Sequence, residues 1–114
     1  MSKNKISFLE ELQKISEKAE QNQIERIKEY IKEKYLDSIK NRLIAAAERG
    51  KYVDGFYIEI DDTFKDYSSI LISNSIRHIL AIELNLPENS ITFNKILWNI
   101  NKSNDRYMFT IDWS

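Results

Sequence analysis

The strongest strand signal in the chain is the segment Tyr107-Met108-Phe109-Thr110-Ile111-Asp112-Trp113. Large apolar and aromatic side chains occupy its odd positions, and Met108, Thr110 and Asp112 fall between them. A period of two predicts a strand with one face buried and the other facing solvent. The chain therefore contains a sheet, and other segments must supply the neighbouring strands and the cover for the buried face.

Two further segments, residues 52–60 and 91–100, carry strand patterns. The first alternates cleanly, with these apolar residues on one face: Phe56, Ile58 and Ile60. In the second, the apolar residues move from odd to even positions after Phe93. Such a shift predicts a β-bulge near Asn94 and Lys95, because one extra residue reverses the faces of a strand.

The region before Gly50 has the pattern of helices. Residues 1–49 contain no Gly and no Pro, and Ser7 followed by Glu10 has the form of a capping box. Gly50 stands just past the last periodic residue, which is a common helix stop. Helical spacing links these apolar residues: Phe8, Leu12, Ile15, Ala19, Ile24, Ile27, Ile31, Tyr35, Ile39 and Leu43.

A single helix over this region would be about 63 Å long at 1.5 Å per residue. A compact domain of this size has a radius of gyration of only about 13 Å. The helix must therefore break or project. The polar triplet Gln21-Asn22-Gln23 is the first choice for a break and Asp37-Ser38 the second, so we predict helices over 7–21 and 24–49.

A third helix is predicted between the first two strands. Ser68 or Ser69 can cap it, and it runs to about Leu84 because Pro87 follows. Its inward stripe is Ile72, Ile76, Ile79 and Leu80. The polar run 101–105 predicts the turn between the last two strands.

These elements predict an α+β fold in the order α-α-β-α-β-β. The natural packing is a three-stranded, mainly antiparallel sheet with helices on one face. Residues 1–114 form a single domain, with a long helical region over 1–50 and a βαββ unit over 51–114. We expect the helical region to form either a projecting helical hairpin or a dimerising helix, because its apolar stripe needs a cover.

Composition limits the classes of function. The chain has 114 residues, 42% hydrophobic and 31% charged, which is normal for one folded domain. Its net charge is −1, so no global field attracts nucleic acid or an anionic membrane. It has no cysteine, which excludes disulfides and thiolate metal sites. Neither a signal peptide nor a membrane span is predicted, and we expect a cytoplasmic protein.

An acidic cluster at the end of the first strand is a candidate site. It consists of Glu59, Asp61, Asp62 and Asp66. Clustered carboxylates can hold Mg²⁺ or Ca²⁺, but acidic residues before a helix also stabilise its N-terminus. We expect a solvated loop here, with no metal and no cofactor, and keep a cation- or ligand-binding loop over 59–66 as an alternative.

Six basic residues of the predicted helix 24–49 are candidate phosphate contacts: Arg26, Lys28, Lys32, Lys34, Lys40 and Arg42. They could contact phosphates and would make the chain a nucleic-acid-binding regulator. Acidic residues are interleaved with them, which is typical of a solvated face with local ion pairs. Nucleic-acid binding is therefore a disfavoured alternative.

Aromatic residues suggest an interaction surface, because Tyr and Trp are enriched in protein interfaces. Tyr30, Tyr35 and Tyr57 are the partner-binding candidates, with the acidic loop as an electrostatic complement. Three other aromatic residues are expected in the core: Trp98, Phe109 and Trp113. If helices cover one face of the sheet, the opposite face exposes Tyr57, Leu97 and Met108.

Residues 43–113 resemble small accessory proteins of phages and other mobile elements. The resemblance is carried by Leu43-Ile44-Ala45-Ala46-Ala47-Glu48-Arg49-Gly50-Lys51-Tyr52 and by the final strand with Tyr107 and Ile111-Asp112-Trp113. Many such proteins join a helix of this kind to a short α+β unit. The resemblance implies that the chain binds a host or competitor protein, as inhibitors of bacterial defence systems do.

The sequence as a whole favours a non-catalytic protein-binding module. It has no Gly-rich phosphate loop, no serine-elbow motif and no zinc or kinase signature, and its single histidine, His78, lies in no triad. We therefore expect no enzyme, but a protein that binds, and can inhibit, a host protein. A homodimer through the N-terminal helices is a linked prediction.

Overall fold

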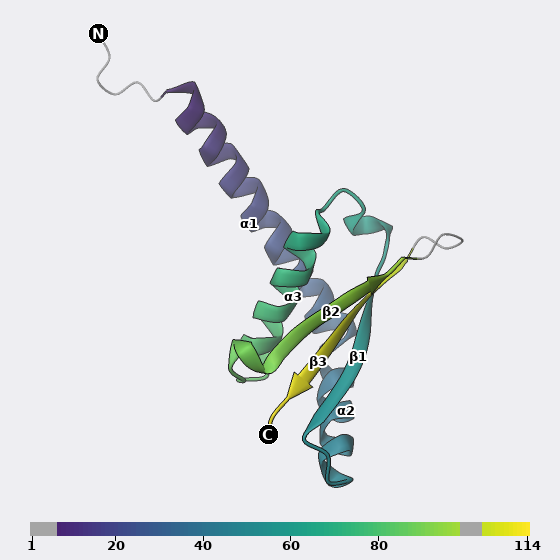
Figure 1. Ribbon diagram of the computed structural model, residues 1–114. Coiled ribbons are helices and arrows are strands. Elements are labelled where there is room, and N and C mark those ends of the chain that lie inside the picture. Colours follow the sequence, from purple (N-terminus) through teal and green to yellow (C-terminus); the bar gives the residue numbers. More distant parts are fainter. Residues whose placement is uncertain (1–6, 99–103) are drawn as a thin grey trace.

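The computed structural model describes residues 7–98 and 104–114, and confirms the α+β class and the order α-α-β-α-β-β (Figure 1). The helices and strands are α1 (Phe8–Lys34), α2 (Leu36–Glu48), β1 (Val53–Ile60), α3 (Ser69–Glu83), β2 (Ile91–Leu97) and β3 (Asp105–Asp112). Two short 3₁₀ turns complete them, η1 (Asp62–Phe64) and η2 (Glu88–Ser90).

The strands form one antiparallel sheet in the order β1-β3-β2. The strand with the clearest alternation, β3, is central and pairs with both others. The register of β2 against β3 shifts between Phe93 and Lys95, which confirms the predicted bulge. Of the predicted turn 101–105, residues 101–103 lie outside the described residues, as does Ile100, and Asp105 already belongs to β3.

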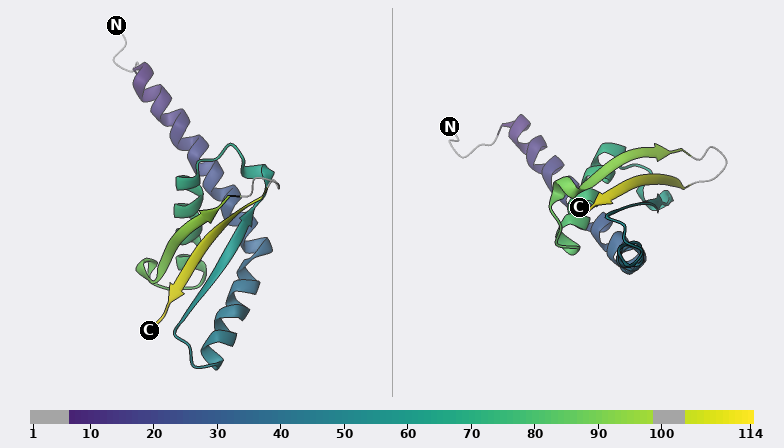
Figure 2. Two further views of the ribbon diagram at one scale, coloured as in Figure 1. Left: turned by 45° about the vertical axis from the view of Figure 1, so that its right-hand side comes forward. Right: turned by 60° about the horizontal axis from the view of Figure 1, so that its bottom comes forward.

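The core lies between one face of the sheet and the helices. Figures 1 and 2 show α2 beside β1 and α3 beside β2 on the same side of the sheet. Phe109 of the central strand is buried between Phe56 at 6.1 Å and Phe93 at 5.4 Å, measured between ring centroids. The other buried sheet residues are Ile58, Ile60, Ile91, Tyr107 and Ile111, and the helices contribute Ile27, Ile31, Ile39, Ile72, Ile76, Ile79 and Leu80.

The helix caps and the helix stop that the sequence predicts are present in the structure. The Ser7 hydroxyl accepts the Glu10 N–H at 3.1 Å, and the Ser68 hydroxyl accepts the Leu71 N–H at 3.1 Å. Gly50 has a φ of +80°, which a residue without Cβ adopts with little strain.

The predicted break at Gln21-Asn22-Gln23 is wrong. The helix α1 runs through these residues and ends at Lys34, so the break lies at Tyr35, next to the second-choice position. Gln is a good helix former, and solvated polar residues do not by themselves interrupt a helix. Tyr35 departs from helical geometry, with a φ of −127° and a ψ of −26°, and α2 beyond it packs against β1.

The first half of α1 projects from the domain. Every side chain from Phe8 to Asn22, a segment we call the arm, is exposed, and the buried residues of α1 are Ile27 and Ile31. The radius of gyration is 17.7 Å and the extents are 69 × 36 × 22 Å, whereas a compact domain of this length would have a radius near 13 Å. The arm therefore extends from the domain as part of a single helix, whereas a helical hairpin or a dimerising helix was expected from the sequence.

Candidate protein-binding surfaces

The first two candidate residues, Tyr30 and Tyr35, hold the edge of the sheet. The Tyr30 hydroxyl donates to the Glu59 carbonyl at 2.7 Å. The Tyr35 hydroxyl accepts the Glu59 N–H at 3.0 Å and also lies 3.4 Å from the Glu59 carbonyl. β1 is an edge strand, so these hydroxyls occupy the backbone groups that a further strand would use.

The rings of these tyrosines pack inward. Tyr30 lies 5.0 Å from Phe64, edge to face, and 6.0 Å from Tyr35. Burial raises the pKa of Tyr30 well above its usual value. Both tyrosines therefore contribute to the docking of α1 and α2 on the sheet, and their partner-binding role stays a prediction.

Several basic side chains of the helices are also engaged within the chain. Arg42 donates through Nε to the Gly55 carbonyl at 3.0 Å and pairs with Asp54 at 2.9 Å. The other engaged residues are Lys32, 3.6 Å from Glu83, and Lys34, 5.2 Å from the centroid of the Tyr30 ring. Half of the six expected phosphate contacts thus already have partners, which weakens the nucleic-acid alternative.

The acidic residues near β1 do not converge. Asp61 caps η1 by accepting the Thr63 N–H at 2.9 Å, and the Glu59 carboxylate pairs with Arg106 at 3.1 Å. The remaining two, Asp62 and Asp66, are exposed. Within residues 7–98 and 104–114, no three acidic or histidine side chains lie close enough to hold a metal ion. The cation-binding alternative gains no support from this geometry.

The outer face of the sheet carries Tyr57 as expected, opposite Met108 of β3, and Leu97 lies on the same face across β3. The Arg106 guanidinium lies 4.7 Å above the Tyr57 ring and pairs with Glu59 on the same face. The apolar patch is therefore interrupted by an ion pair. This face is mixed in character and less suited to burial than a continuous apolar surface.

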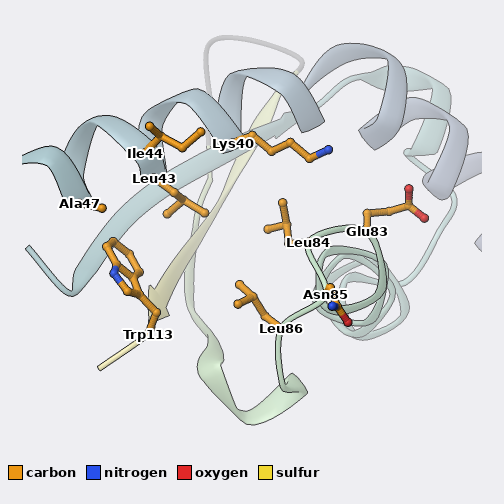
Figure 3. A pocket seen from close by; sticks show the side chains of 9 residues that line it. All are labelled: Lys40, Leu43, Ile44, Ala47, Glu83, Leu84, Asn85, Leu86 and Trp113. Carbon is orange, nitrogen blue, oxygen red and sulfur yellow. The ribbon is translucent and has the colours of Figure 1, made fainter.

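A largely apolar groove with a volume of about 480 Å³ lies between α2 and the end of α3. Figure 3 shows Leu43, Leu84 and Leu86 directed into the space between the two helices, with Trp113 at one end. The rest of the lining is Lys40, Ile44, Ala47, Glu83 and Asn85. Lys40 and Glu83 supply the charged groups, at the end away from Trp113 (Figure 3).

The end of α3 and the outer side of α2 form the walls of this groove. Asn85 takes a positive φ of 54°, which ends α3 and turns Leu86 back toward the sheet. Leu43, Leu84, Leu86 and Trp113 are partly buried against the core, so their remaining apolar surface forms the groove. Ile44, 58% exposed, forms part of its wall on α2. An aliphatic hollow of this kind gains free energy when an apolar group displaces its water.

The groove was not predicted from the sequence, and Trp98, which was expected in the core, is exposed. The local pattern carried no clear signal for the groove: Leu43 and Ile44 are consecutive on α2, but Ile79 and Leu80 are consecutive on α3 and both are buried. Phe109 is buried as expected and Trp113 is partly so, but Trp98 is 66% exposed, because it follows the last paired residue of β2.

Comparisons of the chain with protein-family models, curated proteins and solved structures found no significant match. No helix in the described part of the chain is both long enough and apolar enough to cross a membrane. The cytoplasmic location stays a prediction. The surfaces of the chain itself are therefore the basis for assigning a function.

Proposed function

We propose that the chain is a non-catalytic protein-binding module, and that the groove between α2 and α3 receives an apolar segment of its partner. The observation that carries this proposal is the groove itself, which is lined by Leu43, Leu84 and Leu86 and has Trp113 at one end. Interface energy concentrates in such pockets, where an aromatic side chain and its neighbours lose water together.

The lining indicates the chemistry of the partner. Leucine, isoleucine, alanine and tryptophan side chains form the apolar surface, so the partner segment must supply large aliphatic or aromatic side chains. Lys40 stands at the rim and would pair with a carboxylate next to that apolar group. An amphipathic helix with apolar residues on one face and an acidic residue beside them has this combination.

We further propose that the partner is a host protein. The resemblance of residues 43–113 to accessory proteins of phages and mobile elements makes a host protein, such as a defence component, the partner of choice. Binding through the groove would inhibit that protein if the bound segment is one that it needs. The basic residues of α1 and α2 and the acidic loop 59–66 give less support to an alternative function, because their charged groups are engaged within the chain or dispersed.

A capture experiment with two matched variants tests the proposal. The full chain, Ile44→Asp and Ile82→Asp are each immobilised and exposed to lysate of the native host. Ile44 and Ile82 are 58% and 60% exposed, but only Ile44 lines the groove, so both variants should keep the fold. We expect one protein to be retained in stoichiometric amount by the wild type and Ile82→Asp, and lost with Ile44→Asp.

A second measurement locates the contact. The chain has two tryptophans, so Trp98→Phe leaves Trp113 as the only one. Titration with the captured protein should shift the Trp113 emission to shorter wavelength, because the indole loses water in the groove. Equal capture by both aspartate variants, or an unchanged Trp113 emission on binding, would contradict the proposed site.

A further inference from the structure

The arm carries an apolar stripe with no cover in the described chain. Phe8 is 71% exposed, Leu12 45% and Ile15 61%, and Ala19 continues the row at helical spacing. Ser7 caps the helix and the second half of α1 is fixed to the domain, so the stripe is presented on an ordered helix. Figure 1 shows this part of α1 extending beyond α3.

The stripe is a separate surface and does not continue the face that packs on the core. At about 100° per residue, its mean direction differs by about a third of a turn from that of Ile24, Ile27 and Ile31. The inward residues of α1 contact α3, whereas the stripe points away from it. A second helix can therefore lie along the stripe without meeting α3.

We infer that the cover is a second copy of this chain, whose arm packs antiparallel to the first in a symmetric pair. With Leu12 and Ile15 as heptad positions a and d, Phe8 is a d position and Ala19 an a position. An antiparallel pair places a against d. Leu12 then packs against Ile15 of the second copy, and Phe8 packs against its Ala19.

Side-chain size favours this orientation. In the antiparallel pair, the largest stripe residue, Phe8, faces the smallest, Ala19, and two residues of similar volume fill the central layers. In a parallel pair each residue would face its own copy. Two Phe8 rings would then meet at one end, and two Ala19 methyl groups would leave a gap at the other.

The charged residues beside the stripe also favour the antiparallel orientation. Glu11 and Lys18 flank the stripe at g positions, and antiparallel packing brings Glu11 next to Lys18 of the second copy, twice by symmetry. In the parallel pair the same two residues would face Ser16 and Gln23, which carry no charge. Only the antiparallel arrangement joins opposite charges.

The geometry leaves room for both domains. The paired segments, residues 8–19, overlap over about 18 Å, and the two domains then lie at opposite ends of the helix pair. The pair uses none of the residues that line the groove between α2 and α3. It is therefore independent of the proposed function, and either can fail without the other.

Cysteine pairing tests the orientation, and the chain has no cysteine of its own to interfere. We expect an equimolar mixture of Phe8→Cys and Ala19→Cys chains to form a disulfide-linked heterodimer under mild oxidation, and each variant alone to form none. In the antiparallel pair the two copies of residue 19 are about 16 Å apart along the axis, too far for a disulfide. Self-linking of Ala19→Cys, or no link in the mixture, would overturn the inference.

Sedimentation equilibrium tests the association itself on the full chain. The wild type should show a monomer–dimer equilibrium, and Leu12→Glu should be monomeric at concentrations where the wild type is mostly dimeric. Ile82→Glu is the matched control, because Ile82 is 60% exposed on α3 and does not line the hollow that α3 forms with Glu20 and Ile24, so this variant should dimerise normally. A wild type that stays monomeric at the highest attainable concentration refutes the pairing.

A charge swap separates the two orientations a second time. Glu11→Lys and Lys18→Glu should each weaken dimerisation by roughly tenfold at low salt, because every antiparallel pair becomes repulsive. The double variant should recover most of the wild-type affinity. If the single variants leave the affinity unchanged, Glu11 and Lys18 do not meet and the antiparallel arrangement is wrong.

Discussion

At the scale of single residues, the Tyr35 hydroxyl is more important to the fold than that of Tyr30. The Glu59 N–H has Tyr35 as its acceptor, whereas the Glu59 carbonyl lies near both hydroxyls. We expect Tyr35→Phe to lower the free energy of unfolding by about 1–2 kcal/mol and Tyr30→Phe by about half of that. Urea unfolding of both variants measures this, and the reverse order would contradict our assignment.

Two tyrosines make stability depend on alkaline pH. Burial raises the pKa of Tyr107 from 10.0 to about 12, and burial also raises that of Tyr30. Between pH 10 and 12 the unfolded chain releases these protons while the folded chain keeps them. The stabilising contribution is therefore complete below pH 10 and decreases above it.

The corresponding measurement is urea unfolding of the wild type and Tyr107→Phe from about pH 8 to about pH 11.5. We expect the free energy of unfolding to fall more steeply above about pH 10 in the wild type than in the variant, because Phe has no proton to release. Lysine titration affects both proteins alike, so the difference isolates Tyr107. Parallel curves for the two proteins would count against the raised pKa.

The two glycines give a matched pair of substitutions. Gly50 has a φ of +80°, and a Cβ added there would meet nothing within 4 Å, so the strain of Gly50→Ala lies in the backbone alone. We expect it to cost about 1–2 kcal/mol. Gly55 lies within β1, where an added Cβ would be 3.6 Å from the Phe109 carbonyl, an ordinary contact. Thermal unfolding should show Gly55→Ala to be close to neutral.

At the scale of elements, the two halves of α1 differ in what stabilises them. Residues 24–34 are held by the core, whereas the arm depends on helix propensity and the Ser7 cap. In dilute solution we expect amide hydrogens of residues 11–22 to exchange at least about tenfold faster than those of residues 27–34. Hydrogen exchange read by mass spectrometry measures this, and equal protection in dilute monomer would show that the arm has tertiary contacts.

Sequence patterns predicted the elements better than the junctions between them. The alternation in β3, the bulge after Phe93 and the Ser68 cap are local signals, and the structure confirms them. The break at Tyr35 lies two residues before Asp37-Ser38, so the local polar signal located it only approximately and ranked it below Gln21-Asn22-Gln23. The order β1-β3-β2 depends on packing over long sequence separations, and the pattern of each strand alone does not determine it.

At the scale of the whole molecule, the sequence predicted exposed residues less well than buried ones. Tyr57 lies on the outer face as expected, but Tyr30 and Tyr35 turn inward, because amphipathic side chains can pack a ring and still satisfy a hydroxyl. The groove was missed since its residues come from α2, α3 and the end of β3. Such a surface exists only after the elements have packed.

The length of the molecule affects how its mass has to be measured. A chain of 13.6 kDa with extents of 69 × 36 × 22 Å experiences more frictional drag than a sphere of equal mass. On a gel-filtration column calibrated with compact standards, the single chain would elute early and resemble a larger particle. Light scattering, which reports mass without regard to drag, is therefore the method that distinguishes one chain from two.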